Sequence, residues 1–429
     1  MMRVDTLFIG LVCFTSFFPW VSFGFLNFGS DIQIYSTLIC IIILPLVLLL
    51  KFFRKDGYVF IKDRLFYGVL LFILGCILTI FSILIIDGVN FDALRGVFPY
   101  LSSIIWIVFV SLIFRDYSES IAKILPVIFL IWFAVGLIQL LYDRNFLVSS
   151  LNRTVITNDR GVISLGSEPA YFAMVSLCFT VLFYFQKKKL LTLLSIVTLI
   201  LLTRSSAVIF PLVLSLSIYW IGPFIRASTK NNFKFLLLMS FFIILLFLVL
   251  LMILAYDSGA FYEVNASSRI AKLLQMFATL DFSGLIMDGS FNIRLTHYAG
   301  SIYYFLSDYG VPHGVISWPD YISSFSKNSQ IFWDTGLNQT TRINSGLGTI
   351  LFEGGWFGIA IFYGLYLIVT AYEPSKVKRM LLFLVLVLFF MTVFSIKIPF
   401  LYTTLMLYCA SKKKEFELNK HENKFPTMS

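Results

Sequence analysis

The sequence predicts an all-α polytopic membrane protein with about twelve transmembrane helices and a large, partly helical outer loop. Its 429 residues are 59% hydrophobic and only 13% charged, and the mean hydropathy is +0.89. A typical soluble domain is about 45–50% apolar and about 25% charged. The apolar residues form continuous runs of helix length, without the alternation of a membrane barrel. Lys and Arg gather in short clusters between these runs.

The apolar runs define the predicted helices, because a helix that crosses a bilayer needs roughly 20 apolar residues. The first run is not followed by a small-residue cleavage site, so we interpret it as a retained helix rather than a signal peptide. The predicted helices lie near 6–26, 32–53, 65–86, 97–114, 121–142, 169–185, 190–203, 206–224, 234–256, 345–371, 380–396 and 399–410.

The basic clusters predict the orientation, because Lys and Arg are enriched in cytoplasmic loops. With the N-terminus inside, every cluster falls in the cytoplasm, and so does the C-terminus. One helix over 380–410 would place the last cluster outside, so we predict two short helices hinged near Lys397 and Pro399. The clusters follow the second, sixth, eighth, tenth and last helices, at Lys51, Arg54, Lys55, Lys62 and Arg64, at Lys187–Lys189, at Arg226, Lys230 and Lys234, at Lys376, Lys378 and Arg379, and at Lys412–Lys414.

The remaining composition excludes other classes of protein. The net charge of +10 is explained by the inside loops, so we expect the lipid bilayer and no nucleic acid as a partner. The five cysteines all lie in apolar stretches without the spacing of metal ligands. We therefore expect neither a disulfide framework nor a metal site.

The polar segments divide the chain into four parts. Residues 1–256 hold the first nine helices and an outer connection, 143–168; the other parts are a large outer loop at 257–344, the last three helices at 345–411, and a cytoplasmic tail at 412–429. The large loop is rich in aromatic residues, which a solvated linker would lack. We expect it to fold against the membrane with short helices near 267–279 and 294–307, and loops of this length are usually functional.

A charged stretch precedes the sixth predicted helix: residues 158–173 read NDRGVISLGSEPAYFA. One interpretation is structural, because Ser167 or Glu168 can cap a helix that begins at Pro169. Capping does not explain Arg160 or the aromatic Tyr171. The functional interpretation is that Glu168 and Arg160 frame a polar cavity at the outer membrane surface.

Two further arginines lie at predicted outer ends of helices. Arg204 follows the seventh helix in LLTRSSAV, and Arg95 lies at the start of the fourth in FDALRGVFPY. Each is either a side chain that reaches back to the membrane interface or one that holds a phosphate group with a bidentate grip.

Arg294 and His297 lie in the large loop at a spacing that places both on one face of a helix. His297 is one of three histidines. It is either a hydrogen-bonded bystander or, beside an arginine, a group that binds a phosphate oxygen or moves a proton.

The tenth predicted helix is preceded by Arg342 and Asn344 and contains Glu353. A carboxylate inside a membrane helix is costly, so it should face protein. The structural interpretation is a buried glutamate paired with a neighbour. Gly354, Gly355 and Gly358 would permit close helix packing beside it.

Taken together, these segments resemble the bacterial O-antigen and capsular polysaccharide repeat-unit polymerases of the Wzy type. The order of the segments and the topology carry the resemblance, because the motif spacing is only approximate. The R-x-x-G-x-x-x-EP-x-x-x-A-like segment is Arg160, Gly161, Glu168, Pro169 and Ala173; the LLT-x-S-R-like turn is Leu201, Leu202, Thr203, Arg204 and Ser205; the R-x(n)-G-x-G-like element is Arg294, Gly310 and Gly314; and the N-x-x-L-x-x-x-x-E-x-G-x-x-G-like element is Asn344, Leu347, Glu353, Gly355 and Gly358.

The resemblance implies a GT-C-like, metal-independent membrane glycosyltransferase without a cofactor. It would act at the periplasmic face of the inner membrane on undecaprenyl-diphosphate-linked glycans, with a polysaccharide chain-length regulator as partner. Fixed arginines would stabilise the leaving diphosphate, and a base would lie near the acceptor hydroxyl. The candidate cations are Arg160, Arg204 and Arg294, then Arg95 and Arg342; the candidate bases are Glu168, then His297.

Two alternatives stay open at the level of sequence. An O-antigen ligase, which moves the finished glycan to lipid A core, would share the fold and the arginines and needs a histidine in the large loop, such as His297 or His313. A lipid-linked oligosaccharide flippase is disfavoured, because flippases tend to have short loops and two similar halves. This chain has no internal repeat and an asymmetric loop at 257–344.

Overall fold

A computed structural model provides the fold. The described residues are 4–21, 34–53, 64–151, 161–205, 208, 212, 289–328, 343–392 and 395–422. This part of the chain is helical and contains no β-strand; a single antiparallel bridge joins Val21 to Leu151. The predicted all-α class is therefore confirmed over the described ranges.

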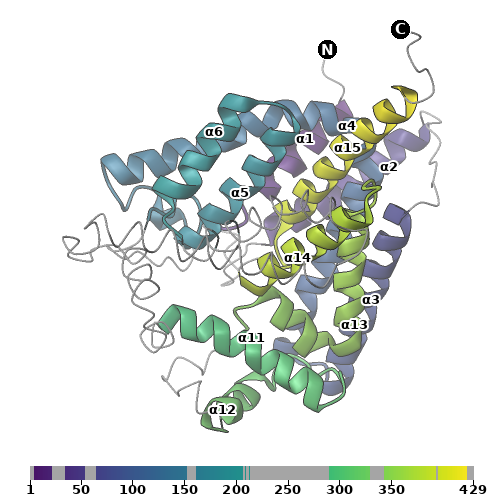
Figure 1. The fold of residues 1–429 in the computed structure, drawn as a ribbon, viewed down its shortest axis with the longest axis vertical. Helices are drawn as coiled ribbons and strands as arrows, with labels where there is room; N and C mark the ends of the chain where they lie inside the picture. Colours follow the sequence, from purple (N-terminus) through teal and green to yellow (C-terminus); the bar gives the residue numbers. More distant parts are fainter. Residues whose placement is uncertain are drawn as a thin grey trace, which may run out of the picture.

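The helices, shown in Figure 1, follow the apolar runs. The helical elements are α1 (Val4–Ser16), α2 (Tyr35–Phe53), α3 (Arg64–Ile86), α4 (Phe91–Leu141), η2 (Val148–Ser150), α5 (Pro169–Phe185), α6 (Lys189–Val197), η3 (Thr198–Leu202, a π-helical turn), α11 (Gly289–Ser307), α12 (Trp318–Asn328), α13 (Gly346–Val369), α14 (Lys376–Thr392) and α15 (Pro399–Glu422). The predicted helices 206–224 and 234–256 and the loop helix 267–279 lie outside the described residues, except for Val208 and Leu212.

Several helices are apolar enough to lie in a membrane. Within the described ranges, four segments also have the length to cross it: Arg64–Ile86, Phe91–Leu112, Tyr117–Leu141 and Gly346–Val369. The shorter apolar helices are Thr6–Ser16, Tyr35–Leu49, Pro169–Phe185 and Lys189–Leu202. These helices fit a multi-pass membrane protein.

Three predicted boundaries need correction. The first helix ends at Ser16 rather than near 26, because Pro19 follows and disfavours helix at the residue before it. The expected break between 114 and 121 is absent: the backbone is helical from Phe91 to Leu141. That helix also begins before 97, because the Asn90 side chain accepts a hydrogen bond from the Ala93 amide (2.8 Å) and caps it.

The last helix also differs from its predicted length. α15 begins at Pro399 as expected but continues to Glu422, through the tail predicted at 412–429. α14 ends at Thr392, so the predicted hinge between two separate helices is confirmed. In the large loop, α11 ends at Ser307 as predicted but begins at Gly289 rather than 294, and α12 was not predicted.

Several of the described basic residues gather at one end of the bundle. Lys188 Nζ donates to the Ala122 carbonyl (2.9 Å), and Lys414 Nζ lies 3.2 Å from Glu119 Oε1. Lys412 lies 5.0 Å from the centre of the Phe185 ring. We call this the basic end. It contains the start of α6, the end of α15 and the middle of α4, as the upper part of Figure 1 shows.

The opposite end is covered by α11 and α12, which lie at the bottom of Figure 1. The segment between them, residues 308–317, contacts the turn between α3 and α4. There the Val315 amide donates to Asp87 Oδ2 (2.7 Å). We call α11, α12 and residues 308–317 the cap. The large outer loop therefore folds onto the helices in its described part, as predicted.

A close contact joins α3 to α13. A Cβ atom on Gly75 would lie 2.8 Å from the backbone nitrogen of Ile361, and one on Gly364 would lie 2.7 Å from that of Phe72. Such small residues let membrane helices approach closely and gain dispersion energy. Because α13 also carries Glu353, this contact positions the polar residues described below.

We expect Gly75→Ala to destabilise the protein by about 1–3 kcal/mol, because the new methyl group pushes α3 away from the α13 backbone. Gly10→Ala in α1 is the matched control: its methyl group would meet only the end of the Ile124 side chain, at 3.0 Å. Both changes raise the helix propensity of their helix by a similar amount, so the difference between the two variants reports the packing at Gly75. Thermal unfolding of the purified protein in detergent measures the difference, and equal melting temperatures for the two variants would contradict the account.

Candidate functional site

The described residues just before α5, in the connection predicted to be outer, are buried in the bundle instead of lying on its surface. Residues 162–167 are all buried. The Gln139 side chain of α4 donates to the Ser164 carbonyl (2.9 Å) and accepts from the Ser164 amide (2.6 Å). The Ser164 hydroxyl donates to the Trp132 carbonyl (2.6 Å). These three hydrogen bonds hold Ser164 at a positive φ of 51°, so the segment has a fixed path to Glu168.

Glu168 occupies the N-cap position of α5, but its side chain makes no capping hydrogen bond. Pro169 is the first helical residue, as predicted. The Glu168 side chain is half-buried, which leaves its carboxylate available for another role. Tyr171, one turn inside, stacks on Trp20 with ring centres 4.8 Å apart.

The LLTRS turn lies directly against this segment. The Val162 amide donates to the Leu202 carbonyl (2.9 Å), and a side chain on Gly161 would collide with the Thr203 backbone. Arg204 has a positive φ of 45° and an exposed side chain. The structure thus brings together two segments that the sequence analysis singled out separately.

Glu353 is the buried carboxylate of α13, with 5% of its surface exposed. Tyr100 of α4 donates its hydroxyl to Glu353 Oε2 (2.7 Å). The positive charge of Lys397 acts favourably on Glu353, and the negative charge of Asp87 acts against it. The structural interpretation of Glu353, a buried glutamate with a partner, is confirmed. Sequence reasoning missed Tyr100, because a tyrosine in an apolar span gives no signal.

The helix α13 is interrupted just after Glu353. Gly355 has φ 53° and ψ −128°, a conformation outside the helix. The Trp356 amide donates to the Gly310 carbonyl (3.0 Å), and the His313 amide donates to the Phe352 carbonyl (3.0 Å). An interruption at membrane depth is tolerated only where other protein groups satisfy the freed backbone. Here the cap supplies those groups, so the cap and the interruption form one unit.

His313 anchors this unit from the cap. Its ring stacks on Phe352 with centres 4.7 Å apart, and its Nε2 lies 2.6 Å from Asp308 Oδ2. The hydrogen bond with His313 holds the pKa of Asp308 below its usual value. The sequence suggested His313 only as a possible ligase histidine, and its pairing with Asp308 was not predicted.

His297 of α11 is buried, with none of its surface exposed. Its Nδ1 accepts a hydrogen bond from the Asn344 amide (2.8 Å), and the Trp318 ring lies edge-on at 5.3 Å. Burial lowers the pKa of His297 to about 4. His297 is therefore neutral at pH 7 and connects α11 to the start of α13, while the Asn344 side chain is exposed.

The hinge before α15 lies near both the Glu168 segment and the Glu353 segment. Phe400 lies 5.8 Å from Trp20, which stacks on Tyr171. The Ile396 carbonyl accepts from the Ser103 hydroxyl (2.8 Å) on α4. Lys397, half-buried between these contacts, acts on Glu353. A residue predicted only as a hinge thus lies between the Glu168 side of the bundle and the Glu353 side.

The other predicted residues are less fully placed. Arg95 is exposed on the first turn of α4, and Arg294 lies in α11 in a stretch whose side chains are not described. Arg160 and Arg342 lie outside the described residues. Within the described ranges, no group of three or more His, Cys, Asp or Glu side chains is arranged to hold a metal ion.

The chain matches no known protein-family model, and no curated protein or solved structure is significantly similar to it. A proposed function therefore depends on the contacts described above.

We expect His297 to make stability depend on pH. Its pKa is about 4 when folded and about 6.5 when unfolded, so between these values the unfolded chain binds the extra proton. The neutral, buried His297 therefore contributes to the free energy of unfolding in full above pH 6.5. This contribution is lost as the pH falls toward 4, by about 3 kcal/mol in total. His297→Asn keeps an acceptor for the Asn344 amide but cannot titrate. Melting temperatures between pH 7.5 and 4.5 should fall less steeply for this variant, and parallel curves would contradict the assignment.

Proposed function

We propose that this chain polymerises undecaprenyl-diphosphate-linked repeat units into O-antigen or capsular polysaccharide, at the outer face of the bacterial inner membrane. It would transfer the growing glycan to the non-reducing end of a new repeat unit. In this proposal the chain has about twelve spans with both termini in the cytoplasm, so the capped end faces the periplasm. A chain-length regulator is the expected protein partner.

The pairing of the motif segments is the observation that carries this proposal. The Val162 amide is hydrogen-bonded to the Leu202 carbonyl, and Gly310 and His313 are hydrogen-bonded to α13 on both sides of Glu353. These contacts bring the four loosely matched motifs together as two pairs, which supports the proposal. The glycines of the last two motifs also lie where glycine is needed, since Gly310, Gly314 and Gly355 all have positive φ.

In the proposed reaction, the acceptor sugar's hydroxyl oxygen attacks the donor's reducing-end carbon. The bond from that carbon to the diphosphate oxygen breaks, and undecaprenyl diphosphate leaves with the electron pair. The hydroxyl proton passes to a base, for which Glu168 is our first candidate. Its half-buried carboxylate is not used for capping, and its backbone is fixed by the Gln139 hydrogen bonds to the preceding segment.

Fixed positive charges would stabilise the leaving diphosphate without a metal. Arg160, Arg204 and Arg294 are the main candidates, with Arg95 and Arg342 behind them. The exposed Arg204 lies beside the Gly161 segment. We add Lys397 to these candidate cations, because its half-buried side chain lies in the hinge between the Glu168 side and the Glu353 side of the bundle.

We assign His297 and Asn344 a positioning role in this proposal. The Nδ1 lone pair of His297 is occupied by the Asn344 amide, which leaves Glu168 as the better base. Tyr171, stacked on Trp20, offers an aromatic face near Glu168 on which a sugar ring of the substrate can lie.

Deletion of the gene tests the proposal, with the surface glycan separated on a gel. We expect the ladder of long chains to collapse to core plus one repeat unit. Complementation with Glu168→Gln should leave the ladder collapsed, because loss of a general base slows a reaction by about 10²–10⁴-fold. Arg160→Ala and Arg294→Ala should fail as well.

Two matched controls accompany these variants, at equal membrane levels. Glu119→Gln makes the same chemical change at the basic end, and Arg144→Ala removes an arginine from the outer connection; both should restore the ladder. Loss of every glycan-bearing band with long lipid-linked chains accumulating would indicate a ligase instead. An unchanged ladder in the deletion strain would reject both enzymes and favour a transporter.

A further inference from the structure

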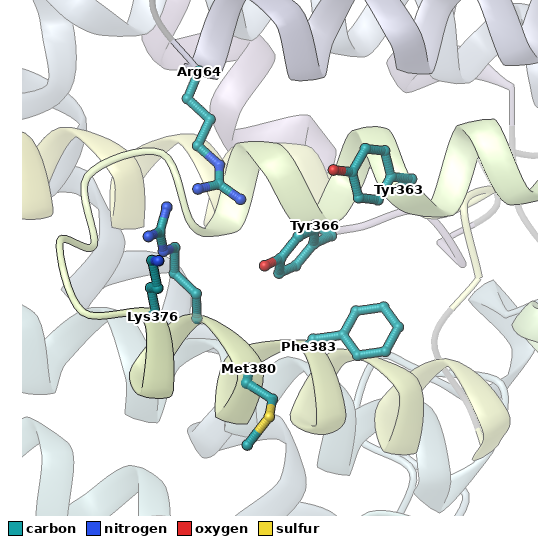
Figure 2. Close-up of a pocket in the computed structure, with 7 residues that line it drawn as sticks. Arg64, Tyr363, Tyr366, Lys376, Met380 and Phe383 are labelled. Atoms are coloured by element: carbon teal, nitrogen blue, oxygen red, sulfur yellow. The ribbon is translucent and has the colours of Figure 1, made fainter. Parts of the chain in front are cut away.

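A second polar site lies at the basic end, far along α13 from Glu353. A cavity of about 500 Å³ opens between the start of α3, the second half of α13 and the start of α14. Its main lining residues are Arg64, Tyr366, Lys376, Arg379, Met380 and Phe383. Figure 2 shows Arg64 reaching from α3 toward the Tyr366 ring and toward Lys376 on α14. None of these residues belongs to the proposed reaction site.

Three positive charges meet in this cavity. The Arg64 guanidinium lies 5.4 Å from the centre of the Tyr366 ring, and the buried Arg64 Nε has no hydrogen-bond partner in the described part of the chain. No described carboxylate forms an ion pair with Arg64, Lys376 or Arg379. Like charges repel at short range, so a bound anion would stabilise this arrangement.

The first turn of α14 adds to the positive potential. Lys376 is its first residue and Arg379 lies one turn on, so both are on the same face of the helix. The free backbone N–H groups at a helix start carry a partial positive charge and favour anions, above all phosphate. Arginine grips phosphate through two parallel hydrogen bonds.

The opposite wall of the cavity is apolar and aromatic. The Tyr366 and Phe383 rings meet edge to face at 5.4 Å, and Met380 lies beside them in the lining. Tyr363 is 47% exposed and Leu384, next to Phe383, is 40% exposed. The cavity also lies where the apolar span of α3 begins. A ligand that suits both walls has a charged head and an apolar tail.

We propose that this cavity binds the phosphate headgroup of an anionic membrane phospholipid. Arg64 and Arg379 hold the phosphate oxygens, Lys376 adds charge at the rim, and an acyl chain lies along Met380 and Phe383. Basic pockets between membrane helices on the cytoplasmic side are typical of sites for such headgroups. The bound lipid fastens α14 to the α3–α13 pair. This inference depends on the chain spanning a membrane and not on the proposed glycan chemistry.

Lipid titration of the full-length protein, purified in detergent, tests this inference. Native mass spectrometry counts bound phosphatidylglycerol and gives its apparent Kd, with phosphatidylcholine and inorganic phosphate as separate probes. We expect phosphatidylglycerol to bind more tightly than either. Each basic residue near a membrane surface contributes about 1 kcal/mol toward anionic lipid, so Arg64→Gln with Arg379→Gln should weaken binding by about 25-fold.

Lys378→Gln is the matched control, because Lys378 lies on α14 beside the cavity residues but does not line it; its Kd should match that of the wild type. An unchanged Kd in the double variant would overturn the inference. Equal binding of phosphatidylcholine would show that charge does not matter, and full competition by inorganic phosphate at a matched concentration would show a phosphate site instead of a lipid site.

If the double variant does not fold, the exposed Lys376→Gln should still weaken binding about fivefold, and no change would reject the proposal.

Discussion

The interruption of α13 at Gly355 is the feature on which the capped end of the molecule depends. A helix in a membrane leaves no backbone group free, so a break survives only where other groups take over the hydrogen bonds. Here the Gly310 carbonyl and the His313 amide do so. The cap is thereby fixed to the helix that carries Glu353, and the stacking of His313 on Phe352 extends the contact to side chains. One glycine with positive φ thus determines how a soluble-like segment meets the bundle.

Glu353, just before this interruption, lies where other side chains interact with its charge. Glu353 accepts from Tyr100 on α4 and is acted on by Lys397 from the hinge before α15. A buried carboxylate is costly unless paired and hydrogen-bonded, so α4, α13 and the hinge must keep their relative positions. The hinge in turn contacts Trp20 through Phe400, and Trp20 supports Tyr171. Through these contacts the Glu168 side and the Glu353 side of the bundle form one framework.

Hydropathy and single residues predicted much of this architecture. The bounds of α3 and α5 and the hinge before α15 followed from apolar runs, Pro169 and Pro399, because these signals act locally. The early start of α4 and the early end of α1 did not follow, since capping by Asn90 and the effect of Pro19 compete with hydropathy. The role of Tyr100, the contacts of His313 and the Gly161–Thr203 contact were beyond reach, because they depend on which segments become neighbours. The sequence left two interpretations of His297 open, and only the tertiary structure shows that the Asn344 backbone amide donates to its Nδ1.

Hydrogen–deuterium exchange of the Gly355→Ala variant tests most directly whether the cap depends on the interruption of α13. An alanine at φ 53°, ψ −128° is strained by about 1–3 kcal/mol, and its methyl group would press on Gly310 and Pro312. The account predicts that amides of residues 308–317 exchange about tenfold faster or more, while those of α5 keep their wild-type rates. Unchanged protection of residues 308–317 in the variant would contradict the account, because the cap would then be held independently of the break.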